Sequence, residues 1–552
     1  MSNQLYHPKH HVRFVTASSL FDGHDASINI MRRILQQGGA EVIHLGHNRS
    51  VEEVVRAAIQ EDVQGIAVSS YQGGHIEYFK YMYDLLKEKG AGHIKIFGGG
   101  GGVIIPSEIK ELHDYGIAGI FSPEDGRKYG LEGMISMMLK ACDFPTIVDL
   151  QDELEATQQG DDRAIARLIT LVESNLEKAE VSATLEELHL KNQERGTGHI
   201  PILGITGTGG AGKSSLTDEL VRRFLRQYPD KRLAIVSIDP TKQKTGGALL
   251  GDRIRMNAIH HPRVYMRSLA TRKSKTELSL AIQDVLVVLQ QAPFDLIIIE
   301  TSGIGQGDAQ ISEIADVAMY VMTSEYGAPS QLEKIDMIDF ADLIVINKFD
   351  RKGSEDALRD VRKQYQRSHL LFSQSPEEMP VYGTIASQFN DVGTNKLFGA
   401  LIQLMKEKAN LDWSMPQVDE LIVQNENIIL PPERTQYLSD IVRTVRDYKT
   451  FTDEQVTLAR KAFQLEGALE AIKAEGSAED ASLVLLETLK EQTLEKLHPE
   501  SRRLLENWDD LQKQYRQKTL TVMARDKKIV NELTTRSLSG LDIPKIALPK
   551  YE

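Results

Sequence analysis

The sequence has a single cysteine, Cys142, and two tryptophans among its 552 residues. One cysteine cannot form a disulfide within the chain, so a disulfide-stapled secreted fold is excluded and a reducing compartment is favoured. Apolar runs long enough to span a bilayer are also missing, and the first residues, MSNQLYHPKHHVRF, lack the apolar centre of a signal peptide. From these absences we expect a cytoplasmic protein with no membrane partner.

Positive charge is scarce relative to negative charge. The 65 Lys and Arg residues are outnumbered by 79 Asp and Glu, which gives a formal net charge of −14. A general nucleic-acid binder usually presents a basic face, so we expect no nucleic-acid partner. The hydrophobic share of 41% and charged share of 26% are ordinary for soluble globular domains, and the length predicts more than one of them.

Strand and helix patterns alternate over residues 1–145. Short apolar segments predict strands, and the longer amphipathic segments between them predict helices. Such alternation is typical of a doubly wound parallel sheet, here of the flavodoxin-like kind. The expected strands are 12–17, 40–46, 64–70 and 94–102, and the expected helices are 28–37, 50–62 and 75–90.

The rest of the chain divides into four further segments. Residues 146–195 are rich in Glu, Gln and Leu and predict a helical linker. A second α/β series is expected over 196–412, and a mainly helical linker region over 413–540, without the sustained heptad of a coiled coil. Residues 541–552 form a short tail.

A phosphate-binding loop is the strongest motif in the sequence. Residues 207–214, GTGGAGKS, match G-x-x-x-x-G-K-[ST] between an apolar strand and a helix, which is the context that the motif requires. Glycines let backbone N–H groups close around phosphate oxygens, and Lys213 should reach the β- and γ-phosphates. The expected nucleotide-binding residues here are Gly207, Gly209, Gly210, Ala211, Gly212, Lys213, Ser214 and Ser215.

Guanine is the expected base. The strand ADLIVINKFD ends in Asn347-Lys348-Phe349-Asp350, an N-K-x-D signature. A carboxylate at Asp350 can accept hydrogen bonds from guanine N1–H and N2–H₂, which adenine does not offer. GTP or GDP is therefore the predicted nucleotide, although a surface loop would explain this segment taken alone.

Oxygen ligands for Mg²⁺ follow two other strands. Glu300 ends the buried strand FDLIIIE, Asp239 ends a strand, and Asp252 follows in what we expect to be a loop. With the Ser214 hydroxyl, these carboxylates suit Mg²⁺, which prefers oxygen ligands. Arg255 is spaced to reach a phosphate, and Lys213 and Glu300 are the candidate catalytic residues. A polar surface loop is the alternative for 239–255.

Three segments resemble the G-protein chaperones of adenosylcobalamin-dependent acyl-CoA mutases. They are IDPTKQKTGGALLGDRIRM, ETSGIGQGD and NKFD. The resemblance covers roughly residues 150–412 and implies a GTPase that controls cofactor loading and protection on a mutase. Residues 323–337 match the family less well, so Gln331 and Lys334 receive no catalytic role.

The turn SSLFDGHDASI, residues 18–28, has two interpretations. Asp and Gly are common in turns, so a solvated turn would explain it. It also resembles the D-x-H-x-x-G motif of cobalamin-binding domains, which implies that His24 ligates cobalt while Asp22 fixes its tautomer. The same resemblance pairs Ser69 with an S-x-L motif and Gly98 and Gly99 with a glycine pair.

Two positions depart from these cobalamin motifs. Ser27 stands where the first motif has glycine, and Tyr71 stands where S-x-L has leucine. These departures alter two positions around the expected pocket, and they leave the expected ligand His24 in place.

The domain order resembles that of the fused isobutyryl-CoA mutase family. It implies adenosylcobalamin, Mg²⁺ and GTP/GDP as cofactors, a homodimer, and as partners an acyl-CoA-binding barrel and a cobalamin adenosyltransferase. The tail SLSGLDIPKIALPKYE resembles the entry into that barrel, but a barrel takes about 250 residues. We therefore expect the cobalamin-binding and GTPase portion of a mutase that interconverts isobutyryl-CoA and n-butyryl-CoA.

Two other functions stay open at this point. One is a stand-alone chaperone that delivers cobalamin under GTP control without mutase activity. The other is a G protein joined to a sensory α/β domain, with His24 in a plain turn. Cobalamin binding separates the last from the others, and a barrel partner separates the first two.

Overall fold

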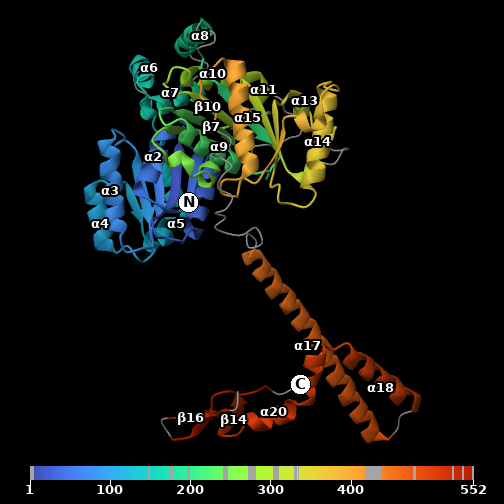
Figure 1. The fold of residues 1–552 in the computed structure, drawn as a ribbon. Helices are drawn as coiled ribbons and strands as arrows, with labels where there is room; N and C mark the ends of the chain where they lie inside the picture. Colours follow the sequence, from blue (N-terminus) through green and yellow to red (C-terminus); the bar gives the residue numbers. More distant parts are fainter. Residues whose placement is uncertain are drawn as a thin grey trace. The chain divides into compact units, whose positions relative to one another are not determined.

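The computed structural model describes most of the chain, in two compact units, residues 1–427 and 428–552 (Figure 1). Residues 302–308 of the segment ETSGIGQGD, together with Gln331 and Lys334, lie outside the described residues. The described residues are 5–146, 150–174, 179–194, 199–239, 241, 247–271, 281–301, 310–327, 332–333, 335–416, 437–476, 480–524, 527–537 and 540–549.

The N-terminal domain is a parallel sheet with helices on both faces. Its strands follow the order β5-β4-β3-β1-β2, continued at the edge by β8, so the flavodoxin-like prediction is confirmed. All residues of β1 are buried, because helices cover both sides of a parallel sheet. The elements are β1 (Arg13–Ser19), α1 (Ala26–Gln37), β2 (Glu41–Arg49), α2 (Val51–Gln60), β3 (Gly65–Ser69), α3 (His75–Glu88), β4 (Lys95–Gly99), α4 (Pro106–Tyr115), β5 (Gly119–Phe121) and α5 (Pro123–Ala141).

The edge strand β8 (Ala248–Leu250) comes from the second α/β series. It pairs in parallel with β2, with Val42 opposite Leu249. The loop expected between Asp239 and Asp252 therefore contains a strand. Three residues are too few to show a period, and the pairing partner lies far away along the chain, so the sequence pattern gave no signal for it.

The second domain is a parallel sheet in the order β13-β12-β11-β6-β10-β7-β9. Most residues of its strands are Ile, Leu, Val, Ala or Met, as expected for a sheet covered on both faces. The strands are β6 (Ile202–Gly207), β7 (Leu233–Asp239), β9 (Val264–Ala270), β10 (Leu296–Thr301), β11 (Val317–Met322), β12 (Leu343–Asn347) and β13 (Val381–Thr384). The helices are α9 (Lys213–Gln227), α10 (Ile282–Leu289), α11 (Ile311–Ile314), α13 (Met337–Phe340), α14 (Ser354–Ser368) and α15 (Val392–Ala409).

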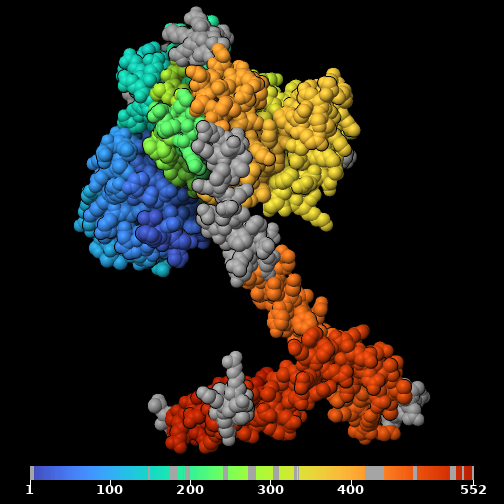
Figure 2. All heavy atoms as spheres, in the orientation of Figure 1, coloured from blue at the N-terminus to red at the C-terminus, as the bar shows by residue number. Residues whose placement is uncertain are grey.

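Three helices connect the two sheets: α6 (Leu150–Gln158), α7 (Asp162–Ser174) and α8 (Ala179–Glu194). The helical prediction for this segment is confirmed, but α7 does more than connect. Its Ile165 and Ile169 are fully buried in the same core cluster as Tyr265 and Val285 of the second domain. The atoms of the two α/β domains adjoin along a continuous boundary in Figure 2.

The second compact unit is mainly helical, as the sequence predicts. Two short antiparallel strand pairs follow its helices, and the backbone carbonyl of Pro549 accepts hydrogen bonds from Trp508 and Gln512. No helix in the described ranges combines the length and apolar character needed to cross a membrane. The elements are α17 (Tyr437–Glu475), α18 (Asp480–Glu495), α19 (Pro499–Glu506), α20 (Trp508–Tyr515), β14 (Thr519–Ala524), β15 (Lys527–Glu532), β16 (Thr534–Arg536) and β17 (Asp542–Pro544).

Candidate functional site

The turn between β1 and α1 holds His24 by means of Asp22. The Asp22 residue is 3% exposed, whereas the His24 side chain is 76% exposed. One oxygen of Asp22, Oδ1, accepts the backbone N–H of His24 at 2.8 Å and lies 2.9 Å from its Nδ1. Because a carboxylate only accepts hydrogen bonds, the ring proton belongs on Nδ1 and the lone pair on Nε2. This imidazole is oriented as metal-binding histidines are.

Residues at the carboxyl ends of β1 and β3 form hydrogen bonds with this turn. The other oxygen of Asp22, Oδ2, accepts the backbone N–H of Tyr71 at 2.6 Å. The hydroxyls of Ser18 and Ser69 are 2.9 Å apart, and each donates to the His24 carbonyl at about 3.4–3.5 Å. The structure thus brings Asp22, His24 and Ser69 together at the carboxyl ends of the strands, where α/β sheets bind ligands.

Beside this turn lies a cavity of about 340 Å³ with a mostly apolar lining. Gly98, Gly99 and Gly100 form one wall. A Cβ at Gly98 would stand 2.3 Å from Phe79 Cζ, and one at Gly100 would stand 1.9 Å from the Ser70 carbonyl oxygen. Close packing therefore requires glycine there. The apolar side chains of the lining include Ile28, Met31, Phe97, Phe121, Leu131, Met134 and Met138.

The contribution of α5 to this cavity was missed by the sequence analysis. Leu131, Met134 and Met138 lie on one face of that helix and line the cavity. Their spacing of three and four residues was the available signal, but it marks a buried helical face and does not distinguish core from pocket.

The phosphate loop wraps around Lys213. Its Nζ donates to the carbonyls of Gly207 and Thr208 at 3.1 and 3.3 Å. Gly207 has φ 148°, and a Cβ there would stand 1.9 Å from the Val321 carbonyl oxygen, while Gly212 has φ 89°. Of the other predicted residues, Gly209 and Gly210 are exposed, Ala211 is buried and Ser215 is partly buried. The loop ends at the N-terminus of α9, a natural anion site.

Ser214 and two carboxylates meet next to this loop. The Ser214 hydroxyl donates to Glu300 Oε1 at 2.6 Å and lies 3.4 Å from Asp252 Oδ1. Asp239 accepts the Gly251 N–H at 3.0 Å. Burial, and secondly repulsion from Asp252, raises the pKa of Glu300 to about 7 and that of Asp239 to about 7. A divalent cation would relieve this crowding of acidic groups.

The protein groups do not by themselves form a complete metal cage. Among the described residues, no three His, Cys, Asp or Glu side chains converge as a metal site. Mg²⁺ commonly takes one or two carboxylates and completes its octahedron with water and phosphate oxygens, so the set at Ser214 fits that pattern. Arg255 contacts Asp252 at the edge of the set, and its side chain is 55% exposed.

The N-K-x-D segment lies against the phosphate loop. Asn347 Nδ2 donates to the Ala211 carbonyl at 2.8 Å, and Lys348 Nζ donates to the Gly210 carbonyl at 2.7 Å. Asp350 is exposed next to them in sequence. Asn347 Oδ1 also accepts the Ala386 N–H at 3.1 Å, which adds the segment after β13 to the site. The sequence analysis did not predict a role for Ala386. The available indication was β13, a short strand that follows the N-K-x-D segment along the chain.

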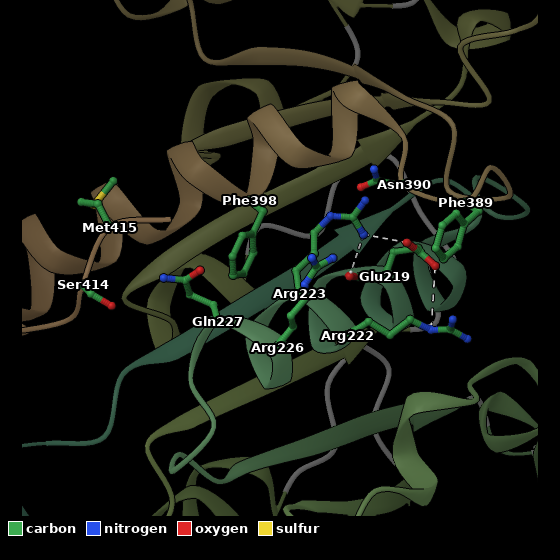
Figure 3. A pocket seen from close by; sticks show the side chains of 10 residues that line it. All are labelled: Glu219, Arg222, Arg223, Arg226, Gln227, Phe389, Asn390, Phe398, Ser414 and Met415. Atoms are coloured by element: carbon green, nitrogen blue, oxygen red, sulfur yellow. Dashed lines mark hydrogen bonds and ion pairs between the residues drawn. The ribbon is translucent and has the colours of Figure 1, made fainter. Parts of the chain in front are cut away.

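A larger cavity, of about 570 Å³, lies on later turns of α9 and against α15 (Figure 3). Arg223 pairs with Glu219 at 2.6 Å, and Arg222 lies 3.3 Å from Asp218. These two arginines are neutralised within their own helix, and none of the predicted nucleotide ligands lines the cavity. It is not the nucleotide site.

A buried ionic cluster joins the two α/β domains. Arg253, which follows Asp252, pairs with Glu61 at 2.7 Å, and Arg13 pairs with the same carboxylate at 2.6 Å. Burial favours the neutral form of Glu61, but the guanidinium groups of Arg253, Arg13 and Arg267 outweigh it and hold its pKa below its usual value. The segment that carries Asp252 is therefore fixed to the end of α2 in the N-terminal domain.

Comparison with known proteins agrees with both halves of this site. Residues 12–124 match the family described as "B12 binding domain", and residues 165–410 match "Methylmalonyl Co-A mutase-associated GTPase MeaB". A fused isobutyryl-CoA mutase of Geobacillus kaustophilus is 66% identical over 549 residues, 99% of this chain and 50% of that protein. One of Cupriavidus metallidurans is 52% identical over 99% of this chain and 49% of its own length.

The chain spans about half the length of these curated relatives. The matched half contains a cobalamin-type sheet with the His24 turn and a P-loop sheet with the guanine motif. The chain thus belongs to the fused isobutyryl-CoA mutase family, of which it carries the B12-binding and GTPase domains.

Proposed function

We propose that this chain is the cobalamin-binding and GTPase part of a radical acyl-CoA mutase that interconverts isobutyryl-CoA and n-butyryl-CoA. The GTPase domain would gate the loading and protection of the cofactor. The observation that carries the proposal is the His24–Asp22 pair beside a glycine-walled apolar cavity, in one compact unit with a phosphate loop. An imidazole with a free Nε2 and a narrow apolar cavity fit a corrinoid whose own base has left the metal.

Adenosylcobalamin, when bound, supplies a carbon radical by homolysis of its Co–C bond. His24 would offer Nε2 to the cobalt. Asp22 would keep the proton on Nδ1, and its second oxygen would stay fixed by the Tyr71 N–H at 2.6 Å. Ser69, Gly98 and Gly99 would line the place of the displaced base, where the apolar side chains exclude water.

The GTPase half would hold the nucleotide through the phosphate loop. Lys213 would neutralise charge on the β- and γ-phosphates, which is where it accumulates during hydrolysis. Asn347, Lys348 and Asp350 would hold the guanine, and Arg255 would reach a phosphate. Ser214, Asp239, Asp252 and Glu300 would hold Mg²⁺ together with water, with Glu300 at the reacting end of the nucleotide.

Substrate binding would come from an acyl-CoA-binding barrel, as a domain or a subunit. A homodimer, delivery of cofactor by a cobalamin adenosyltransferase and a cytoplasmic location belong to the same proposal. They are supported by the family resemblance.

The visible spectrum of cobalamin tests the proposal. Exchange of the cofactor's own base for a protein histidine changes that spectrum, so titration of the unmodified chain should yield a histidine-ligated form. His24→Ala should lose that form, whereas His7→Ala, at an exposed histidine away from the turn, should keep it. Identical spectra and affinities for the unmodified chain and His24→Ala would contradict cobalt ligation by His24 and would indicate a plain solvent-exposed turn.

A further inference from the structure

The two departures from the cobalamin motifs contact each other. Ser27 replaces a glycine and Tyr71 replaces a leucine, and their hydroxyl oxygens lie 3.2 Å apart. Ser27 is in the first turn of α1, and Tyr71 follows β3, so the contact bridges two elements. Both residues line the cavity beside the His24 turn. We infer that this bridge is a paired positioning element for His24 and for the tail of bound cobalamin, an inference that rests on the proposed function.

Tyr71 connects the histidine to the cavity. Its ring centroid is 5.4 Å from that of His24, with the planes inclined by 41°. Its backbone N–H holds Asp22, the residue that fixes the histidine tautomer. A Cβ at Gly101, which follows that glycine wall and also lines the cavity, would stand 3.0 Å from Tyr71 Cε1, so this glycine lies close against the ring. The Tyr71 ring therefore adjoins both the proposed metal-binding imidazole and the cavity proposed for the tail.

The hydroxyl pair determines where this ring lies. A phenylalanine ring would have similar bulk but nothing to bind it to α1, and a leucine would give the imidazole no aromatic neighbour. Glycine at residue 27 would leave the Tyr71 hydroxyl without this partner. The two departures thus match each other, because each hydroxyl gives the other its hydrogen-bond partner across the two elements.

The expected effect follows from the size of one hydrogen bond. A typical bond between neutral groups contributes about 0.5–1.5 kcal/mol, which corresponds to about a 2- to 10-fold change in affinity. Ser27→Ala and Tyr71→Phe should each weaken cobalamin binding by that factor. At saturation, both should show a smaller share of the histidine-ligated spectrum, because the imidazole is less well oriented.

The double variant tests the pairing. If both residues act through one bond, Ser27→Ala/Tyr71→Phe should be no weaker than either single variant. Ser19→Ala is the matched control, because it removes another hydroxyl pair, Ser19 with Ser70 at 2.9 Å, that does not line the cavity. It should bind cobalamin and show the same spectrum as the unmodified chain. GTP affinity, measured in every variant, reports whether the fold is intact.

The outcomes separate this inference from the proposed function. If the unmodified chain shows no histidine-ligated cobalamin, the proposed function fails. If it does show that form, and Ser27→Ala and Tyr71→Phe match it in affinity and spectrum, the bridge has no positioning role. Losses in the double variant that multiply those of the single variants would also overturn the pairing, because the residues would then act independently.

Discussion

Guanine selectivity is expected to depend on one exposed carboxylate. Asp350→Asn would replace the acceptor for guanine N1–H by a group that also carries N–H donors. Affinity for GTP and GDP should fall about 5- to 150-fold, which corresponds to the roughly 1–3 kcal/mol cost of an unmet polar group in a complex. ATP binding, which does not use this carboxylate, should not weaken. Calorimetric titration with both nucleotides measures the difference.

Asp356→Asn is the control for this change, since Asp356 is an exposed acid on α14 that pairs with Arg359 at 2.7 Å. It should bind GTP like the unmodified chain. Equal affinity of the unmodified chain for GTP and ATP would remove the guanine assignment altogether.

The two aspartates that flank the histidine should differ in effect. Asp22 is buried and bonded to His24 and Tyr71, so Asp22→Ala should weaken cobalamin binding about 10- to 100-fold, the usual effect of a group that orients a metal-bound imidazole. Asp25 is exposed and makes no side-chain capping bond on α1, so Asp25→Ala should change little. The measurement is spectral titration. Equal losses in both variants would indicate a loop that attracts the cofactor by charge alone.

Residue by residue, the sequence predicts best where function depends on short spacing. The positions of Lys213 and Asn347 in the nucleotide site were predictable, because each follows or ends a strand of one parallel sheet. The carboxyl ends of such strands lie at the same edge of the sheet. The bond from the Tyr71 N–H to Asp22 spans 49 residues, and that from Arg253 to Glu61 spans 192. No local pattern encodes such partners, so only the folded chain shows them.

At the scale of elements, the strands β1 to β4 were predictable because buried parallel strands consist of short apolar runs. The edge strand β8 was not, since its three residues gain their hydrogen bonds from β2 of the other domain. It ends two residues before Asp252, so a hydrogen-bonded strand joins this proposed Mg²⁺ ligand to the sheet that carries His24.

The ionic cluster beside β8 should be a main source of stability for the domain contact. Arg253 is 4% exposed and Glu61 is completely buried. Arg253→Met would leave Glu61 with one guanidinium fewer, and breaking a buried pair by removing one partner costs about 3–5 kcal/mol. The urea midpoint of unfolding should fall accordingly. Arg359→Met, which removes an exposed pair, should leave it nearly unchanged.

The pH dependence of the free energy of unfolding should also report the ion pair between Glu61 and Arg253. The pKa of Glu61 in the folded chain is held below its usual value of 4.5, so its ionised form stabilises the fold above that pH. This contribution is lost as the pH falls from about 4.5 through the lower folded pKa. Arg253→Met should lose less stability over this window than the unmodified chain, because less of the stabilising charge remains. A parallel loss in both proteins would contradict the assignment of the shift to Arg253.

The whole molecule consists of two units, and the domain boundaries drawn from composition stay a prediction. The first compact unit ends at residue 427, within the segment for which the sequence predicts a helical linker. Amino-acid composition predicts helices well, but it does not indicate which helices pack into the same folded unit. The helices α6 to α8 illustrate this, because a segment expected only to connect contributes Ile165 and Ile169 to a core.

The chain by itself should hydrolyse GTP without interconverting isobutyryl-CoA and n-butyryl-CoA. It spans about half the length of its curated relatives, and the acyl-CoA-binding barrel proposed above takes about 250 residues. Lys213→Ala should reduce hydrolysis sharply, because the charge opposite the transferred phosphate is lost. Gas chromatography of the acyl products and phosphate release measure the two reactions.

Adding the separately produced remainder of a relative, with adenosylcobalamin, should start the interconversion. Turnover by the chain alone would overturn this division of labour, and binding of cobalamin with no turnover after the addition would favour a delivery chaperone.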